Sequence, residues 1–198
     1  MATVGLSKLW CAKYSYDADT GTVEYTDGFS PGKYTELSIE LEGGDSNDFY
    51  ADNNIDESDK TFSGGTCNTT TNDLLADKMV PLLGVKSKPM SDGPEGAAWM
   101  VFDETQQTPD VGQGGVIKKK INGVYKYVAF VLPRIQYANP GIAAVTQGST
   151  IEWQTQSLSA TIKRSEAPDG PWFQISTPFD TEALAEAAVK KFLGITGA

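Results

Sequence analysis

The chain has 198 residues, a length typical of one domain. Its 26 acidic residues outnumber 16 lysines and arginines, and the resulting net charge of −10 argues against a protein that grips nucleic acid through a basic face. Histidine is absent, which excludes Ser-His-Asp and Cys-His catalysis and histidine-ligated metals.

The content of large apolar side chains is low for a folded domain. Leu, Ile, Val and Phe make up 42 of the 198 residues, while glycine alone contributes 20. Threonine, a β-forming residue, contributes 19. A thin core with many β-formers predicts a β-rich domain that completes its burial by associating with copies of itself.

The sequence shows no pattern of secretion or membrane insertion. The N-terminal residues lack the basic segment and apolar run of a signal peptide, and no stretch approaches the ~18 consecutive apolar residues of a membrane span. The two cysteines, Cys11 and Cys67, do not make a disulfide framework. We therefore expect a chain that is made and used without crossing a membrane.

The first part of the chain alternates as half-buried strands do. Strands are predicted over residues 10–16 and 22–26, joined by a turn at Asp17–Gly21. This turn shares two aspartates with calcium loops but lacks their closing glutamate, so a hairpin turn is the better interpretation. The clearest amphipathic strand covers residues 34–42. Its apolar face holds Leu37, Ile39 and Leu41, and its polar face holds Glu36, Ser38, Glu40 and Glu42.

The pattern breaks over residues 43–60, which are rich in acids and poor in apolar side chains. Burial of so few apolar groups cannot compensate the conformational entropy that this segment would lose on ordering within a core. We therefore predict a long acidic loop or extended hairpin, anchored by Phe49, Tyr50 and Ile55. Residues 17–60 hold 13 acids and two lysines, so all the net negative charge lies in this part of the chain. The charge either makes a solubilising face or makes a surface that repels polyanions or like-charged neighbours.

Further strands and two helices complete the prediction. The Asn122-Gly123 turn predicts a hairpin. A C-terminal helix is predicted with Asp180 or Thr181 as its N-cap, Glu182 near its beginning and Lys190 near its end. The predicted strands are 61–71, 97–103, 116–121, 124–137, 149–164 and 171–175, the helices are 72–84 and 181–193, and loops cover 86–96 and 105–115. Together these predict one α+β, mainly β domain over residues 1–198: two packed sheets, as a sandwich or partly closed barrel, flanked by a C-terminal helix.

Candidate chemistry is sparse, and no metal or cofactor site is predicted. A carboxylate pair of the glycosidase kind would have to use Glu152 or Asp103 with Glu104. A carbohydrate-binding or adhesin-like β-sandwich would need exposed aromatic side chains, for which Trp99, Trp153 and Trp172 are the candidates. The basic run Lys118–Lys120 is best interpreted as a solvated or subunit-facing hairpin edge, because alternation sends the middle lysine to the opposite face.

An ordered set of segments carries a family resemblance. These are FYADN at 49–53, LLG at 82–84, GGVIKKKINGVYKYVAFVLPRIQY at 114–137, STIEWQTQSLSATI at 149–162 and the ending FDTEALAEAAVKKFLG. In this order they resemble the major tail proteins of long-tailed phages (siphoviruses) of Gram-positive bacteria, over residues 3–194.

The resemblance implies a structural virion protein with no enzymatic activity and no cofactor. Such proteins assemble in the host cytoplasm into stacked, hexameric rings that form the tail tube of the virion. Their partners are copies of themselves, the tape-measure protein and other tail proteins, and DNA passes through the bore without specific binding or any role for a membrane. Their fold is a pair of packed sheets whose edges join between subunits.

Two groups of residues follow as candidates for these roles. Glu36, Glu40 and Glu42 are expected to line the lumen, where carboxylates would repel DNA. Phe49, Tyr50, Asp52, Asn53 and Ile55 are expected to contact the next ring. The alternative is a monomeric carbohydrate-binding or adhesin-like β-sandwich module.

Overall fold

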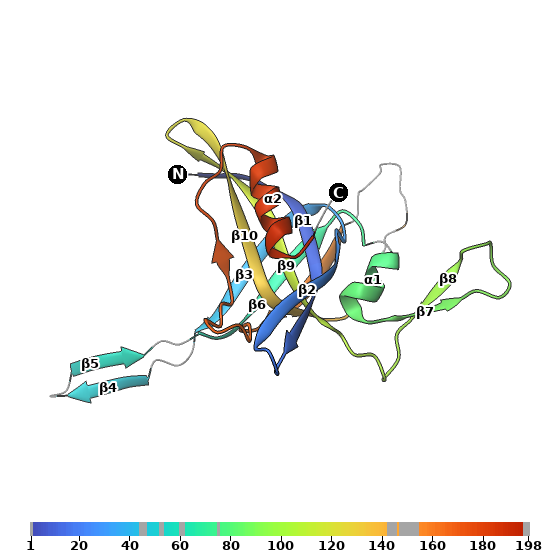
Figure 1. Cartoon of the computed structure of the whole chain (residues 1–198), viewed down its shortest axis with the longest axis horizontal. Helices are drawn as coiled ribbons and strands as arrows, with labels where there is room; N and C mark the ends of the chain where they lie inside the picture. Colours follow the sequence, from blue (N-terminus) through green and yellow to red (C-terminus); the bar gives the residue numbers. More distant parts are fainter. Residues whose placement is uncertain are drawn as a thin grey trace.

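The computed structural model describes residues 2–43, 47–51, 54–59, 62–74, 76–141, 146 and 155–195. Strands make up 54% of the structure, and two helices accompany them (Figure 1). The strands are β1 (Ala2–Asp17), β2 (Thr22–Phe29), β3 (Tyr34–Gly43), β4 (Asn47–Ala51), β5 (Asn54–Asp59), β6 (Phe62–Thr71), β7 (Lys86–Pro89), β8 (Ala98–Val101), β9 (Asp110–Ile121), β10 (Val124–Tyr137), β11 (Gln156–Ile162) and β12 (Gln174–Ile175). The helices are α1 (Ala76–Leu83) and α2 (Glu182–Phe192).

One large antiparallel sheet organises the molecule. Its strand order is β2-β1-β9-β10-β11-β6-β3, with β12 added to β10. The sheet curls, so that β3 at one end of the order comes back into contact with β1, but it does not close into a barrel. Bulges along β1, including one between Ser7 and Trp10, assist the curl because a bulge bends its strand and increases its twist. The prediction of an α+β, mainly β fold with a C-terminal helix is confirmed.

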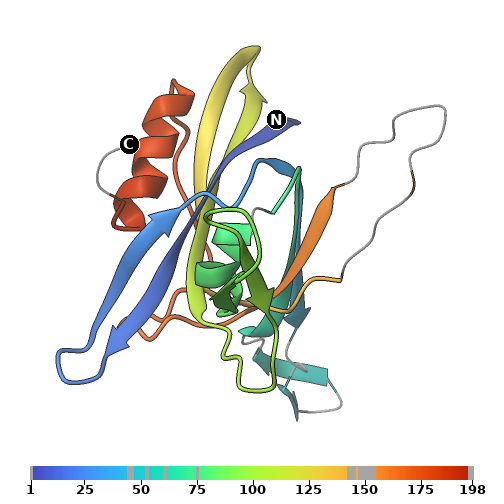
Figure 2. The same cartoon turned by 90° about the vertical axis from the view of Figure 1, so that its right-hand side faces the viewer.

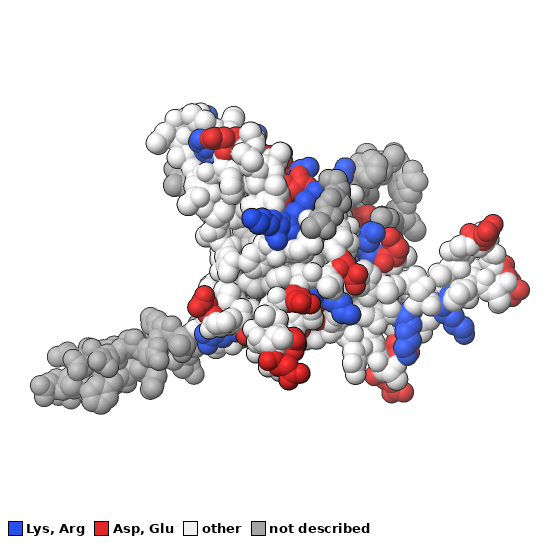
Figure 3. All heavy atoms as spheres, in the orientation of Figure 1, with Lys and Arg blue, Asp and Glu red and all other residues white. Residues whose placement is uncertain are grey.

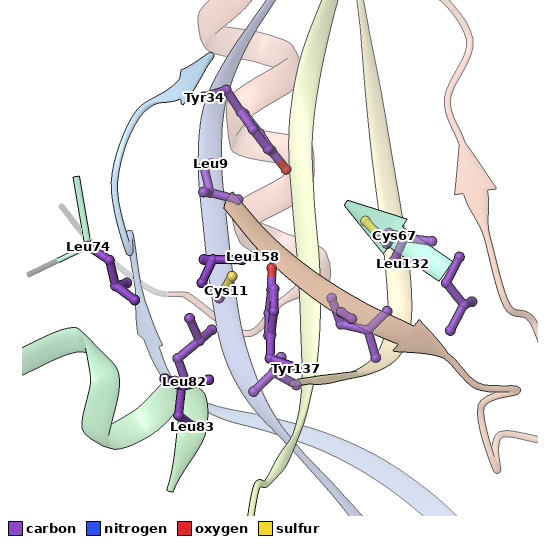
Figure 4. Close-up of a cluster of buried hydrophobic side chains, with 14 of the residues drawn as sticks. Leu9, Cys11, Tyr34, Cys67, Leu74, Leu82, Leu83, Leu132, Tyr137 and Leu158 are labelled. Atoms are coloured by element: carbon purple, nitrogen blue, oxygen red, sulfur yellow. The ribbon is translucent and has the colours of Figure 1, made fainter. Parts of the chain in front are cut away.

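The concave face of the curled sheet encloses the larger core (Figure 4). Leu9 and Cys11 of β1 share it with Tyr137 of β10, and Leu82 and Leu83 of α1 also lie in it. The remaining fully enclosed members include Cys67, Val111, Leu132, Ile135, Leu158 and Ile162.

The convex face of β1, β9 and β10 packs against α2, forming a second core. Thr181, one of the two N-caps that the sequence allows, caps the helix by accepting a hydrogen bond from the backbone N–H of Leu184 at 3.3 Å. Ala185, Val189 and Leu193 are buried on the packing side of the helix. Figure 2 shows α2 lying along one side of the sheet, on the side away from β11.

Several boundaries differ from the sequence prediction. β1 begins at Ala2 rather than at residue 10, β9 begins at Asp110 inside the predicted 105–115 loop, and α1 begins only at Ala76. Residues 86–96 were predicted as a connector, but Lys86–Pro89 forms β7 and pairs with β8 in a separate two-stranded sheet. The predicted 149–164 strand is described from Gln156 onward as β11, and its earlier part lies outside the described residues.

Candidate functional surface

The three carboxylates predicted to line a lumen lie together on β3. Glu36, Glu40 and Glu42 are all exposed, and they project from the same side of the strand, since residues two apart share a face. Leu37 and Ile39 project from the opposite side and pack against the concave core. The period-2 pattern of the sequence therefore correctly predicts which side of β3 carries the carboxylates and which side packs against the core.

The acidic side of β3 continues across two neighbouring strands as a polar surface. Register pairs Glu36 with Thr70, Ser38 with Asn68 and Glu40 with Thr66, and paired residues share a face. β11 extends the same face. We call this surface the polar face; its described members are Glu36, Ser38, Glu40, Glu42, Gly64, Thr66, Asn68, Thr70, Ser157, Ser159 and Thr161.

The polar face has no large apolar side chain among these members, and α2 does not cover it, because the helix packs on β1, β9 and β10. The residues that alternate with it on β11, Leu158, Ala160 and Ile162, are buried in the concave core. A sheet surface of carboxylates, hydroxyls and amides suits contact with water or with a polyanion that must not adhere.

β3 is also an edge strand. Of the described strands, only β6 pairs with β3, and at the other end of the sheet only β1 pairs with β2. β3 has ten residues and carries an exposed apolar side chain, Leu41, which is 52% exposed. An open edge of this length offers unpaired backbone N–H and C=O groups to another chain, and proteins that stay monomeric usually keep such edges short or cover them.

The acidic segment of residues 43–60 contains a hairpin rather than an unstructured loop. β4 and β5 pair antiparallel, with Tyr50 opposite Ile55 and Phe49 opposite Glu57, and the hairpin projects from the body in Figure 1. The side chains of Phe49, Tyr50 and Ile55, and the whole of Asp52 and Asn53, lie outside the described part of the structure. Their predicted contact role therefore stays a prediction.

The carboxylates considered for hydrolysis do not form a site in the described residues. Asp103 accepts hydrogen bonds from Lys86 Nζ at 2.8 Å and from the backbone N–H and hydroxyl of Thr105. These bonds lower the pKa of Asp103 to about 2, the opposite of the raised pKa that a general acid requires. Glu152 lies outside the described residues.

Of the three tryptophans considered for sugar binding, the two that the structure describes lie in different surroundings. Trp99 on β8 is 61% exposed, whereas Trp172 stacks on Phe62 with ring centroids 4.6 Å apart and packs against the concave core. Trp153 lies outside the described residues. Trp99 is thus an exposed aromatic side chain on the β7–β8 ribbon, and Phe102, just after β8, is also exposed.

In the described structure, a hollow beside the β1 bulge is lined by one carboxylate, and that carboxylate is already engaged. This cavity of ≈ 460 Å³ is lined by residues of β1 and the β2–β3 connection together with Glu186. Glu186 already accepts a hydrogen bond from Trp10 Nε1 at 3.1 Å and pairs with Lys8 at 3.2 Å. In the described ranges, no three Cys, Asp or Glu side chains cluster as a metal site would require.

Comparisons with known proteins do not assign a family. No protein-family model matches the sequence, and a search of curated proteins finds no match. Neither helix of the described structure has the length and apolar character needed to span a membrane.

Proposed function

We propose that the protein is a structural virion subunit that joins edge to edge with copies of itself into hexameric rings, which stack into the tail tube of a siphovirus. The observation that carries this proposal is the combination on β3: a ten-residue open edge and an acidic row, Glu36, Glu40 and Glu42, on the same strand. An edge that must be paired and a surface that must remain polar are both features of a subunit that forms part of a hollow wall.

The two open edges explain how such a wall would grow. β3 ends one side of the large sheet and β2 ends the other, so each copy presents a different edge on each side. Pairing one edge with the other edge of the next copy is a heterologous contact, which closes into a ring when the rotation per subunit divides a full turn. The sheets of neighbouring copies would then form one continuous wall.

The polar face would line the bore. Three carboxylates per copy, repeated around a ring, produce a negative field that keeps DNA phosphates from adhering while the genome passes. The tape-measure protein and other tail proteins are the partners implied by the family resemblance. The β4–β5 hairpin, which projects from the body, is the segment proposed to reach the neighbouring ring through Phe49, Tyr50, Asp52, Asn53 and Ile55.

Electron microscopy of concentrated protein in negative stain tests the proposal, together with sedimentation velocity across a range of concentrations. We expect rings or tubes. A protein that stays monomeric at every concentration would contradict the proposal and favour the carbohydrate-binding alternative, for which the exposed Trp99 is the supporting observation.

A substitution at the edge sharpens this test. Leu41→Lys places a charge on the open edge of β3, a substitution that natural edge strands use to prevent pairing, and we expect it to raise the concentration needed for assembly about tenfold. Leu184→Lys is the matched control, because Leu184 on α2 is 54% exposed against 52% for Leu41. Equal loss of assembly in both variants would count against the edge contact.

A further inference from the structure

The two ends of β1 lie next to surfaces of opposite charge. Strand pairing places Ala2 opposite Lys120, beside the β9–β10 turn, and Lys13 opposite Val111. β1 therefore begins at the β9–β10 turn and ends at the β1–β2 turn. Asp17 lies 15 residues further along than Ala2, a distance of up to about 50 Å at roughly 3.3 Å per residue. Figure 1 shows the β9–β10 hairpin and the β1–β2 hairpin at opposite ends of the body.

The β9–β10 end is basic. Residues 116–127 contain four lysines and no acid. Two acids from the α2 segment lie nearby, and both are engaged: Asp180 pairs with Lys126, and Glu182 accepts a hydrogen bond from Ser7. The ion pairs of the described residues do not include Lys118, Lys119 or Lys120.

The basic end also exposes apolar surface. Val4, Val124 and Tyr125 are 51%, 57% and 47% exposed. Lys118 Nζ lies 4.3 Å from the centre of the Tyr125 ring, so the ring holds the ammonium group in place. Exposed apolar side chains among fixed charges are typical of a surface that binds another protein.

The β1–β2 end is acidic. Residues 13–27 contain Asp17, Asp19, Glu24 and Asp27 against the single base Lys13, and all four acids are exposed. Figure 3 shows acidic atoms at the lower end of the body, where this hairpin lies. Asp17 orders the turn by accepting hydrogen bonds from the backbone N–H of Asp19 at 2.9 Å and the hydroxyl of Thr20 at 2.8 Å. Tyr16, 39% exposed, adds apolar surface beside these carboxylates.

We propose that the basic β9–β10 end of one copy docks onto the acidic β1–β2 end of a second copy. The two ends belong to one rigid sheet and point away from each other, so the contact is head to tail and repeats without closing. The inference rests on the proposed function, since it names a second contact, besides that of the β4–β5 hairpin, by which copies stack along the tube. It also fixes a polarity: every copy presents lysines in one direction and carboxylates in the other.

Charge reversal at each end tests the contact. Lys118→Glu/Lys120→Glu reverses the basic end. Asp19→Lys/Glu24→Lys reverses the acidic end at two exposed side chains that do not take part in the turn's hydrogen bonds among the described residues. Each single-ended variant should raise the concentration for half-maximal assembly tenfold or more. The combined variant has complementary ends again, so its concentration for half-maximal assembly should lie within about threefold of the wild-type value.

Lys88→Glu/Lys191→Glu is the matched control, because it changes the net charge as much as Lys118→Glu/Lys120→Glu but at two exposed lysines that belong to neither hairpin. Sedimentation velocity at low and high salt measures the fraction of assembled protein at each concentration. The melting temperature of each variant reports whether it is folded. A combined variant that assembles no better than the single-ended variants, or a control that loses as much, overturns the inference. Reversal variants that assemble like the wild type refute this contact alone, whereas a wild type that stays monomeric refutes the proposed function together with it.

Discussion

Gly114 of β9 lies directly beneath Val189 of α2, so closely that a Cβ at position 114 would stand 2.6 Å from Val189 Cγ1. The carbonyl oxygen of Phe130 would lie 2.9 Å away on the other side. Gly112 stands in the same relation to Leu193, whose Cδ2 would lie 2.8 Å from an added Cβ. The helix is therefore seated at a distance from the sheet that only glycine permits at these two positions.

Gly114→Ala should lower the free energy of unfolding by about 1–3 kcal/mol, because the added methyl group overpacks the junction between α2 and the sheet. Urea unfolding measures the change. Gly5→Ala is the control, since an added Cβ at Gly5 of β1 meets nothing within 4 Å. Adding Val189→Ala to Gly114→Ala should recover part of the loss, and a fully additive double mutant would show that the two residues do not clash.

The amide of Gln113 links β9 to three other strands, β3, β6 and β10, inside the concave core. Its Nε2 donates to Tyr34 Oη at 2.8 Å and to Thr69 Oγ1 at 3.1 Å, and its Oε1 accepts from the hydroxyl of Tyr137. Gln113→Leu should lower the free energy of unfolding by about 3 kcal/mol or more, because three buried polar groups would lose a partner. Gln107→Leu, at an exposed glutamine, should change it by no more than about 0.5 kcal/mol, and similar losses in both variants would contradict the role given to this network.

The two buried thiols, Cys11 and Cys67, lower the free energy of unfolding at alkaline pH. Burial raises the pKa of Cys67 from 9.0 to about 11, opposed by its contact with Thr69 Oγ1, and burial together with the nearby Cys67 raises the pKa of Cys11 further. Above pH 9 the unfolded chain loses these protons first, so their contribution to stability, fully present below pH 9, declines as the pH approaches 11. The difference in unfolding free energy between wild type and Cys67→Ala should shrink over this range. Parallel pH profiles for the two proteins would refute this account.

The sequence correctly predicts those elements whose turn or cap residues lie beside them in the chain. Asn122 and Gly123 adopt φ values of 50° and 84°, which a two-residue hairpin turn requires, and Thr181 caps α2. The start of β9 was missed because its glycines resemble a loop, whereas the structure requires them for the close approach of α2. β7 was missed because Lys86–Pro89 is an exposed ribbon without an apolar alternation.

The candidate surface was predictable only in part, for a related reason. Alternation along residues 34–42 correctly predicts that Glu36, Glu40 and Glu42 share a face. It cannot show that this face continues across β6, because the residues of β6 between Thr66 and Thr71 are polar on both sides apart from Cys67. Pairing between strands far apart in the chain decides that continuation, and periodicity within one strand contains no information about it.

Reversing the acidic row should make the assembled protein retain DNA. If the polar face lines the bore, tubes of Glu36→Lys/Glu40→Lys/Glu42→Lys would surround DNA with positive charge, and short double-stranded DNA should sediment with the tubes at low salt and be released at high salt. Asp92→Lys/Glu95→Lys/Asp169→Lys makes the same charge change at loops outside the polar face. Because outward-facing lysines also attract DNA, the decisive readout is protection from a nuclease too large to enter the tube. DNA on the β3 variant should be protected and DNA on the control digested, and equal digestion of both would place Glu36, Glu40 and Glu42 on the outer wall.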